Sequence, residues 1–131
     1  MTTGYNVTLR NAQLNAITTA VGNAGTLTIY SGVQPATGGA LSGNTALATF
    51  TLGSPFAPAA AAAVLSPTLP ANVNAAATGT ATWFRVATSG GTQEIDGTVG
   101  TAGADLNLNT TSLVSGVAVS VTAWTITRGN P

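Results

Sequence analysis

The stretch TGTATWFRVATSGGTQEIDGTVG, residues 78–100, is the clearest indication of the fold class, because it predicts a β-hairpin. Small polar residues alternate with apolar ones on both sides of Ser89-Gly90-Gly91. A glycine-rich step between two alternating runs is a turn signal. We therefore expect paired strands over 78–88 and 92–99, a unit typical of antiparallel β domains.

Within this hairpin, Arg85 faces a carboxylate in either of two registers. A two-residue turn at 89–90 places Arg85 opposite Glu94, and a turn at 90–91 places it opposite Asp96. We expect a structural ion pair that fixes the strand register and contributes roughly 0.2–1 kcal/mol if it is exposed. Trp83 shares the face of Arg85, which favours a guanidinium–indole contact.

A glycosidase-type carboxylate pair is the alternative interpretation of these acids. Glu94 and Asp96 stand two apart on a strand, so their side chains point the same way. A hydrolase of this kind also needs a cleft lined by sugar-binding groups. Nucleophilic mechanisms that use histidine or cysteine are excluded, because the chain has neither residue. We therefore expect no enzyme and no cofactor.

Charge is scarce throughout the chain. Its 131 residues include three basic and three acidic ones, with a net charge of zero and no histidine or cysteine. Three arginines cannot form the basic stripe that nucleic acids require, and ordinary zinc, haem and iron–sulfur sites lack their ligands. Such a surface either stays soluble through uncharged hydrogen bonding or is covered by another subunit. We favour the second, because interface cores are depleted in charge.

The rest of the chain predicts one helix and several short strands. Residues 8–21 carry a helical apolar stripe, with Thr8 as the N-cap and Gly22 or Gly25 at the end. Period-two alternation follows at 26–30, 45–52, 105–109 and 117–127. In 45–52 we expect Ala46, Ala48, Phe50 and Leu52 to share a face, and near Ala123 either a bulge or burial on both sides.

Residues 53–77 are ambiguous, because a run of alanines is bracketed by prolines at 55, 58, 67 and 70. We expect an irregular crossover there, with at most one helical turn. The fold class is then a mainly β, antiparallel β-sandwich or jelly-roll-like single domain over 1–131, with one N-terminal α-helix. The helix packs at one end of the sandwich or is donated to a neighbouring copy.

Two ligand hypotheses and two targeting features receive less support. Asp96 and Asp105 lie in glycine turns without the dense ligands of a calcium loop, so we expect turn aspartates. Trp83, Phe84 and Trp124 form a sugar-stacking platform only if they are exposed. The N-terminus has no signal-peptide pattern, and the most apolar stretch, 57–65, is too short to span a bilayer. We expect a chain that is neither secreted nor membrane-bound.

Four segments resemble a family of small tailed-phage and prophage virion proteins. They are LRNAQLNAI (9–17), LTIYSGVQPA (27–36), ATGTATWFRV (77–86) and GTVGTAGADLNLNTTSLVSGVAVSVTAWTI (97–126), which together cover 59 of the 131 residues and touch both ends and the middle of the chain. The chain departs from the family in PAAAAAVLSPTLPANVN, residues 58–74. The resemblance implies a virion structural protein and, within that class, favours a capsid decoration or cement protein, which is typically a β-sandwich or jelly roll.

Such a protein sits on the outer surface of the capsid, after synthesis in the cytoplasm of the bacterial host, and bridges subunits of the major capsid protein. The implied partners are that protein and further copies of this chain, as a dimer or trimer; neither nucleic acid nor a membrane is expected. We expect the contacts in terminal and glycine- or proline-rich segments. The candidate residues are Tyr5, Val7, Leu9, Val33, Gln34, Pro35, Leu41, Pro55, Phe56, Pro58, Val64 and Leu65.

Two other roles stay open: a tail, neck or baseplate protein, and a carbohydrate-binding adhesion module. The adhesion role predicts that Trp83 or Trp124 is open to solvent. The cement role predicts both indoles buried in a core or an interface.

Overall fold

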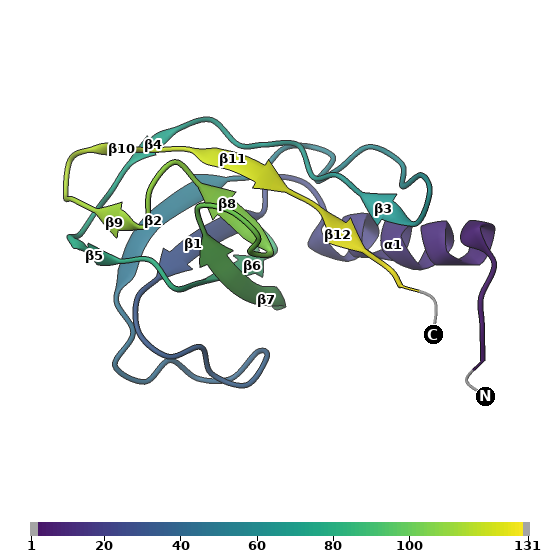
Figure 1. Cartoon of the computed structure of the whole chain (residues 1–131), viewed down its shortest axis with the longest axis horizontal. Helices are drawn as coiled ribbons and strands as arrows, with labels where there is room; N and C mark the ends of the chain where they lie inside the picture. Colours follow the sequence, from purple (N-terminus) through teal and green to yellow (C-terminus); the bar gives the residue numbers. More distant parts are fainter. Residues whose placement is uncertain (1–2, 130–131) are drawn as a thin grey trace.

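The computed structural model describes residues 3–129 and is mainly β, with one helix in that range (Figure 1). The chain order is α1 (Val7–Val21), β1 (Thr26–Tyr30), β2 (Ala46–Thr51), β3 (Val64–Leu65), β4 (Val73–Asn74), β5 (Gly79–Thr80), β6 (Trp83–Ala87), β7 (Gln93–Gly100), β8 (Leu106–Leu108), β9 (Ser112–Leu113), β10 (Ala118–Val119), β11 (Val121–Trp124) and β12 (Ile126–Thr127).

A six-stranded sheet in the order β11-β8-β7-β6-β1-β2 is the main element. Three short ribbons complete the β structure: β10-β4 and β5-β9 lie at one end of the molecule, and β12-β3 lies at the other end beside α1 (Figure 1). Within the described residues, all strand pairs are antiparallel except β7 and β8, which pair in parallel over two residues. The predicted mainly β, sandwich-like class is confirmed.

The core lies between the sheet and the layer formed by the ribbons and the crossover. Leu27 stands opposite Val86, and Ile29 opposite Phe84, so these four apolar side chains share one face. All four are buried and belong to one apolar cluster with Phe50, Phe56 and Trp124. The alternation of side chains along β1 and β6 therefore places these four apolar residues on the buried face, since alternate residues of a strand point the same way.

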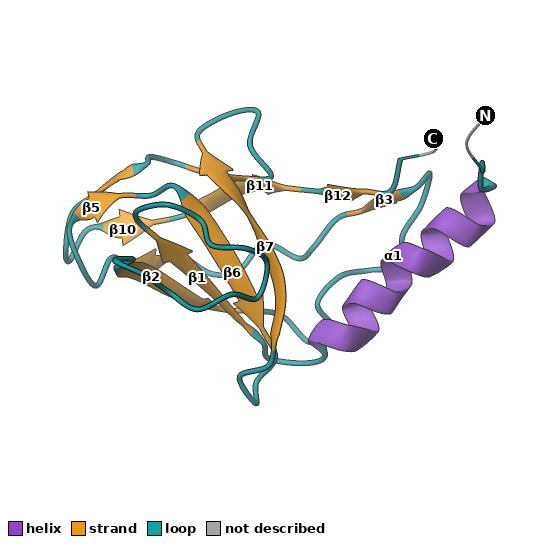
Figure 2. Ribbon diagram, turned by 90° about the horizontal axis from the view of Figure 1, so that it is seen from below, coloured by secondary structure: helices purple, strands orange, loops and turns teal. Residues whose placement is uncertain are grey.

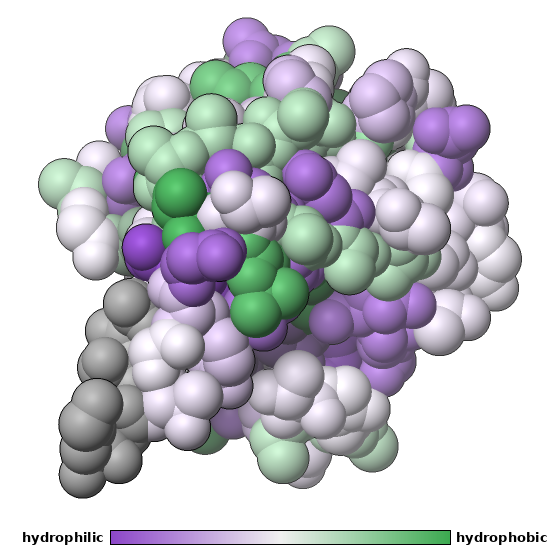
Figure 3. All heavy atoms as spheres, turned by 90° about the vertical axis from the view of Figure 1, so that its right-hand side faces the viewer, coloured by the Kyte–Doolittle hydropathy of each residue, from purple (hydrophilic) through white to green (hydrophobic). Residues whose placement is uncertain are grey.

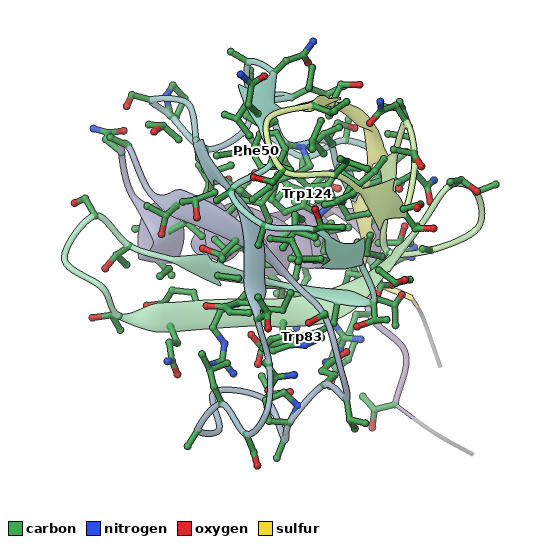
Figure 4. The ribbon with its side chains drawn as sticks, turned by 90° about the vertical axis from the view of Figure 1, so that its left-hand side faces the viewer. Phe50, Trp83 and Trp124 are labelled. Atoms are coloured by element: carbon green, nitrogen blue, oxygen red, sulfur yellow. The ribbon has the colours of Figure 1, made fainter. Side chains whose placement is uncertain are left out.

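The opposite face of the sheet carries a separate group of side chains. Tyr30 stands opposite Trp83, and Arg85 opposite Asp96, on the residues that alternate with the core positions. Figure 4 shows Trp83 on one side of the ribbon of the sheet and Phe50 and Trp124 on the other. Trp83 is only 1% exposed. A second cover, formed by residues 31–44, must therefore lie over this face.

Helix α1 packs on its own domain at one end of the sheet (Figure 2). Its N-cap is Asn6, whose side chain accepts a hydrogen bond from the Leu9 N–H, so the prediction of Thr8 is wrong by two residues. Both are preferred N-cap residues, which is why sequence alone does not separate them. Gly22 ends the helix with φ 71°, as predicted, and donates its N–H to Thr18.

Several predicted strands are broken where the chain changes partner. The hairpin is confirmed over β6 and β7, but Gly79–Thr80 leaves it and pairs with Ser112–Leu113. The expected long strand 117–127 divides into β10, β11 and β12, each with a different partner. Of the two alternatives given for the region near Ala123, the structure has the bulge, because the register shifts between Val121 and Ala123.

One predicted face needs a correction. Ala48, Phe50 and Leu52 are buried as expected, but Ala46 is exposed and Leu47 is fully buried. The register with β1 shifts here, since Ile29 pairs with Ala48 and Tyr30 with Ala46, which leaves Leu47 as the extra residue of a bulge. A bulge of this kind reverses the alternation beyond it.

The crossover 53–77 contains no helix and only the two short strands β3 and β4, as the prolines predict. Ala62 and Ala63 adopt positive φ angles of 51° and 58°. Two asparagines of the helix hold this segment: the Asn15 side chain accepts from Ala60 N–H and that of Asn11 accepts from Ala63 N–H, both at 2.8 Å.

Candidate interaction site

Arg85 and Asp96 form a bidentate ion pair on the second face of the sheet. Arg85 Nε donates to Asp96 Oδ1 at 2.7 Å, and Nη2 donates to Oδ2 at 2.8 Å. Both side chains are almost completely buried, with exposed fractions of 5% and 1%. In this geometry the guanidinium and the carboxylate hydrogen-bond each other and neutralise each other's charge. The pairing thereby offsets the free-energy cost of removing both charges from water.

The register of the hairpin selects Asp96 and excludes Glu94. Arg85 pairs directly with Asp96. The turn itself lies at 89–90, where the Gly91 N–H donates to the Thr88 carbonyl, so the turn predicted at 90–91 is wrong although its register at Arg85 is found. The pairing then shifts between Val86–Ile95 and Ala87–Gln93, so Glu94 is the extra residue of a bulge and is exposed. The predicted ion pair is therefore Arg85–Asp96 alone. Because the pair is buried, the energy given above for an exposed pair does not apply to it.

The two groups shift each other's titration in opposite directions. The hydrogen bond to Asp96 is the largest cause that raises the pKa of Arg85, against the desolvation that burial imposes. For Asp96, desolvation is the largest single influence and favours the neutral acid. The hydrogen bonds from Arg85 and from the Gly38 N–H, with the charge of the guanidinium, outweigh it and hold the pKa of Asp96 below its usual value.

The ion pair also fastens the loop 31–44 to the sheet. Gly38 donates its N–H to Asp96 Oδ2 at 2.9 Å, across 58 residues of sequence. The Gln93 amide, oriented to satisfy both of its neighbours, donates to the Gly38 carbonyl and accepts from Arg85 Nη1. We call this group, Gly38 with Arg85, Gln93 and Asp96, the latch. It places the middle of an exposed loop against buried charges.

An aromatic stack completes the cover beside the latch. The rings of Tyr30 and Trp83 are stacked, with centroids 4.6 Å apart, and the guanidinium carbon of Arg85 lies 5.1 Å from the Trp83 ring centroid. The predicted guanidinium–indole contact is confirmed. Figure 4 shows Trp83 between the sheet and the loop that follows β1.

The loop is internally braced as well as latched. The Asn44 amide donates to the carbonyls of Ser31 and Val33, and its oxygen accepts from the Ser42 N–H. Val33 nevertheless projects into solvent, with 86% of its surface exposed, and Leu41 is 46% exposed. The structure thus presents apolar side chains on a backbone that is already fixed, so little further entropy is lost when a partner covers them.

A second group of predicted contacts lies at the helix end of the molecule. Val7 and Leu9 are 44% and 46% exposed, and Tyr5 lies beside them with its ring 5.7 Å from the Arg128 guanidinium carbon. The half-buried Val64 belongs to β3, which runs beside α1. Figure 3 shows this end, where pale and light-green residues predominate and strongly apolar ones form small patches.

The remaining predicted contacts divide between surface and core. Pro55 and Pro58 are exposed on the crossover, and Gln34 and Pro35 are half-buried in the loop 31–44. Phe56 and Leu65 are fully buried in the main core, so the prediction that they meet a partner is wrong. Phe56 and Leu65 were predicted as contacts because they are apolar residues in an irregular, proline-rich segment. In the structure this segment packs over the sheet and buries both side chains.

A cavity of about 270 Å³ lies between α1, β7 and the C-terminal strands. Ile17, Phe84, Ile95, Trp124 and Ile126 supply its apolar wall, and Asp105 lies at its polar side. Asp105 Oδ2 already accepts from the N–H and hydroxyl of Thr98. The cavity therefore offers apolar contact, without a carboxylate oriented for a ligand.

Other candidate sites find little support within residues 3–129. Trp124 is 3% exposed and Trp83 1%, so neither indole presents an open face to a sugar. In that range no three potential metal-ligating side chains come together. No described helix combines the length and apolar character needed to cross a bilayer.

The latch and the loop that it fastens contain residues that sequence reasoning missed. Gly38, Gln93 and Asn44 were not predicted as site residues, although glycines at 38 and 39 marked the loop. A hydrogen bond between residues 58 positions apart leaves no local pattern in the sequence.

Searches of protein-family models, curated proteins and solved structures found no match to this chain.

Proposed function

We propose that this chain is a structural protein of a tailed-phage virion that binds the outer surface of the capsid and stabilises it by bridging subunits of the major capsid protein. The observation that carries the proposal is Val33, which is 86% exposed on a loop latched to a buried ion pair. A fixed loop with an exposed apolar side chain is suited to dock in a shallow depression of a partner.

The distribution of exposed contacts supports a bridging role. The loop 31–44 lies on one side of the sheet and the crossover on the other. The end of the molecule that carries α1 points away from both (Figure 1). A chain with adhesive segments on several sides can touch more than one neighbour. On a lattice of repeated subunits, several modest contacts add up to strong attachment.

The near absence of charge supports the same role. With three basic and three acidic residues, of which Arg85 and Asp96 neutralise each other, few ions must be dehydrated at a contact. Short Thr, Ala and Val side chains lose little rotamer entropy when they are covered. Large, shallow, uncharged contacts are what a lattice cement requires.

The test compares Val33→Asp with Val114→Asp in attachment to phage heads that lack this chain. Val114 is also an exposed valine, at 50%, and it lies outside the latched loop. We expect Val33→Asp to reduce the amount that co-sediments with heads by at least about tenfold, because a charge would be buried at the contact. Val114→Asp should attach like the unchanged chain.

The location of the unchanged chain is measured first, by mass spectrometry of separated heads and tails. A fixed ratio to the major capsid protein in heads supports the proposal. Recovery of the chain with tails, at a low copy number, would contradict the proposal and indicate a tail, neck or baseplate protein. Equal attachment of both valine variants overturns the role given to the loop.

A further inference from the structure

The border strand β2 leaves backbone hydrogen-bonding groups without a partner. Antiparallel strands bond through alternate residues. The Leu52 N–H donates to the Gly25 carbonyl, so in the same register Phe50 and Ala48 also point their backbone groups toward β1. The N–H and C=O groups of Thr49 and Thr51 consequently point outward, away from the sheet.

Nothing within residues 3–129 pairs with this outward edge at Thr49 and Thr51. β2 is the last strand of the sheet and pairs only with β1 in the described range. The crossover reaches the edge at one end, where Ala76 N–H donates to the Leu47 carbonyl. Thr49 and Thr51 are exposed, and Figure 2 shows β2 at the border of the sheet.

The edge also lacks the features that usually block strand pairing. Natural sheets protect their borders with charged side chains, proline or bulges. Residues 46–52, ALATFTL, contain no charge and no proline. The bulge of β2 lies at Leu47, so Ala48–Thr51 stays regular. By contrast, the other border strand, β11, has four residues and a register shift in its middle.

We propose that the β2 edge is a self-association site, at which a second copy of this chain pairs antiparallel through its own β2 about a two-fold axis at Phe50. In this register Thr49 of one copy meets Thr51 of the other, and each of the two pairs exchanges both backbone hydrogen bonds. The two six-stranded sheets then form one continuous sheet. The inference stands on the edge geometry and holds whether or not the chain binds a capsid.

The choice of a second copy follows from the symmetry and charge of the edge. The open groups lie at i and i+2, so the segment complements itself when it is turned by 180°. A net charge of zero means that two copies do not repel each other. A two-fold axis at Thr49 would bring Thr51 against Leu47, whose carbonyl already accepts from Ala76. The axis at Phe50 avoids this conflict.

The variants that test the site change the outward edge without removing a bond inside the chain. Thr49→Pro deletes an N–H that has no internal partner, which is the position where a border strand tolerates proline. Thr49→Val keeps that N–H and the β-branched shape, and serves as its control. Thr49→Lys places like charges across the two-fold axis. Thr122→Lys adds the same charge at an exposed position of β11.

Sedimentation velocity over a range of protein concentrations, with hydrogen exchange of the Thr49 and Thr51 amides, measures the outcome. We expect a monomer–dimer equilibrium in which both amides are protected in the dimer and exchange fast after dilution. Thr49→Pro and Thr49→Lys should weaken dimerisation roughly 10- to 100-fold. Thr49→Val and Thr122→Lys should leave it unchanged.

Three outcomes overturn the inference: a monomer at all concentrations, a trimer, or equal dimerisation of Thr49→Lys and Thr122→Lys. Far-UV circular dichroism identifies any variant that fails to fold, and Thr49→Lys carries the test if Thr49→Pro does. The dimer is measured on the isolated chain, without phage heads. A negative result therefore does not bear on capsid attachment, and a chain that fails to attach to capsids can still be tested for the dimer.

Discussion

Arg85 and Asp96 are the most buried charged side chains of the described chain, and each depends on the other. The two hydrogen bonds between these side chains, with a third from the Gly38 N–H, satisfy both carboxylate oxygens of Asp96 and two of the guanidinium nitrogens of Arg85. Taking two charges out of water costs several kcal/mol per ion, which the pairing offsets. The pair therefore fixes the hairpin register and the loop position more than it adds stability over an apolar alternative.

Asp96→Asn should destabilise the fold strongly, because it leaves the Arg85 guanidinium buried without a counter-charge. We expect a loss of about 3–5 kcal/mol in the free energy of unfolding, measured by urea titration. Glu94→Gln is the matched control: Glu94 is an exposed acid of the same strand, and its replacement should stay within about 0.5 kcal/mol. Equal effects of the two changes would contradict the role assigned to the pair.

Acid should remove the stability contributed by Asp96. Its pKa is lowered in the folded chain, so its contribution is fully present above the unfolded value, near 4, and is lost as the pH falls through the lower folded value. Arg85 keeps its charge across this range, because its pKa is raised. Thermal unfolding midpoints between neutral and strongly acidic pH test this: the midpoint should fall only in acid, and less in Asp96→Asn.

At the scale of elements, α1 is held to the crossover by side chains rather than by a broad apolar face. Leu14 and Val21 are its buried residues, while Asn11 and Asn15 accept from the crossover backbone. The crossover has almost no regular structure of its own, so these bonds supply partners for N–H groups that a helix or strand would otherwise satisfy.

Asn15→Ala should loosen the crossover, because the Ala60 N–H loses its acceptor in a partly buried position. We expect a loss of about 1–2 kcal/mol in stability and faster proteolysis within 53–77. Asn23→Ala, at an exposed asparagine beyond the helix, is the control and should change neither. If both variants resist proteolysis equally, the asparagine bond does not anchor the crossover.

The elements that depend on local pattern were predictable from the sequence. The helix, the hairpin and the face of β1 follow from periodicity. The bulge near Ala123 was one of two alternatives, and Arg85–Asp96 was one of two pairings that the expected turns allowed. The inward fold of Phe56 and Leu65, the β5–β9 pairing and the latch at Gly38 depend on contacts between distant segments. Such contacts leave no periodic signal in one sequence.

At the scale of the whole molecule, the sheet separates two kinds of surroundings. One face carries the apolar core, and the other carries the latch and the aromatic stack beneath the loop 31–44. The apolar side chains proposed to contact a capsid through the loop, Val33 and Leu41, lie outside the main core. Partner binding at the loop is therefore expected to act on the latched face and to leave the packing of the core unchanged.

Attachment to the capsid should depend little on ionic strength. The exposed charges are few, and salt screens only interactions between such charges. Co-sedimentation with heads at about 0.05 M and about 0.5 M NaCl is expected to differ by less than about twofold. A steep loss of attachment with salt would show that charge pairs hold the contact, against the proposed uncharged docking.

The two tryptophans lie on opposite faces of one sheet, and this arrangement equips the chain with two native optical reporters. Trp124 is packed in the core against Phe56 and Phe84, whereas Trp83 is stacked on Tyr30 under the loop. In Trp124→Phe, the emission of the remaining indole reports the loop alone. A red shift of that emission at constant circular dichroism would record the loop lifting from the sheet while the core stays folded.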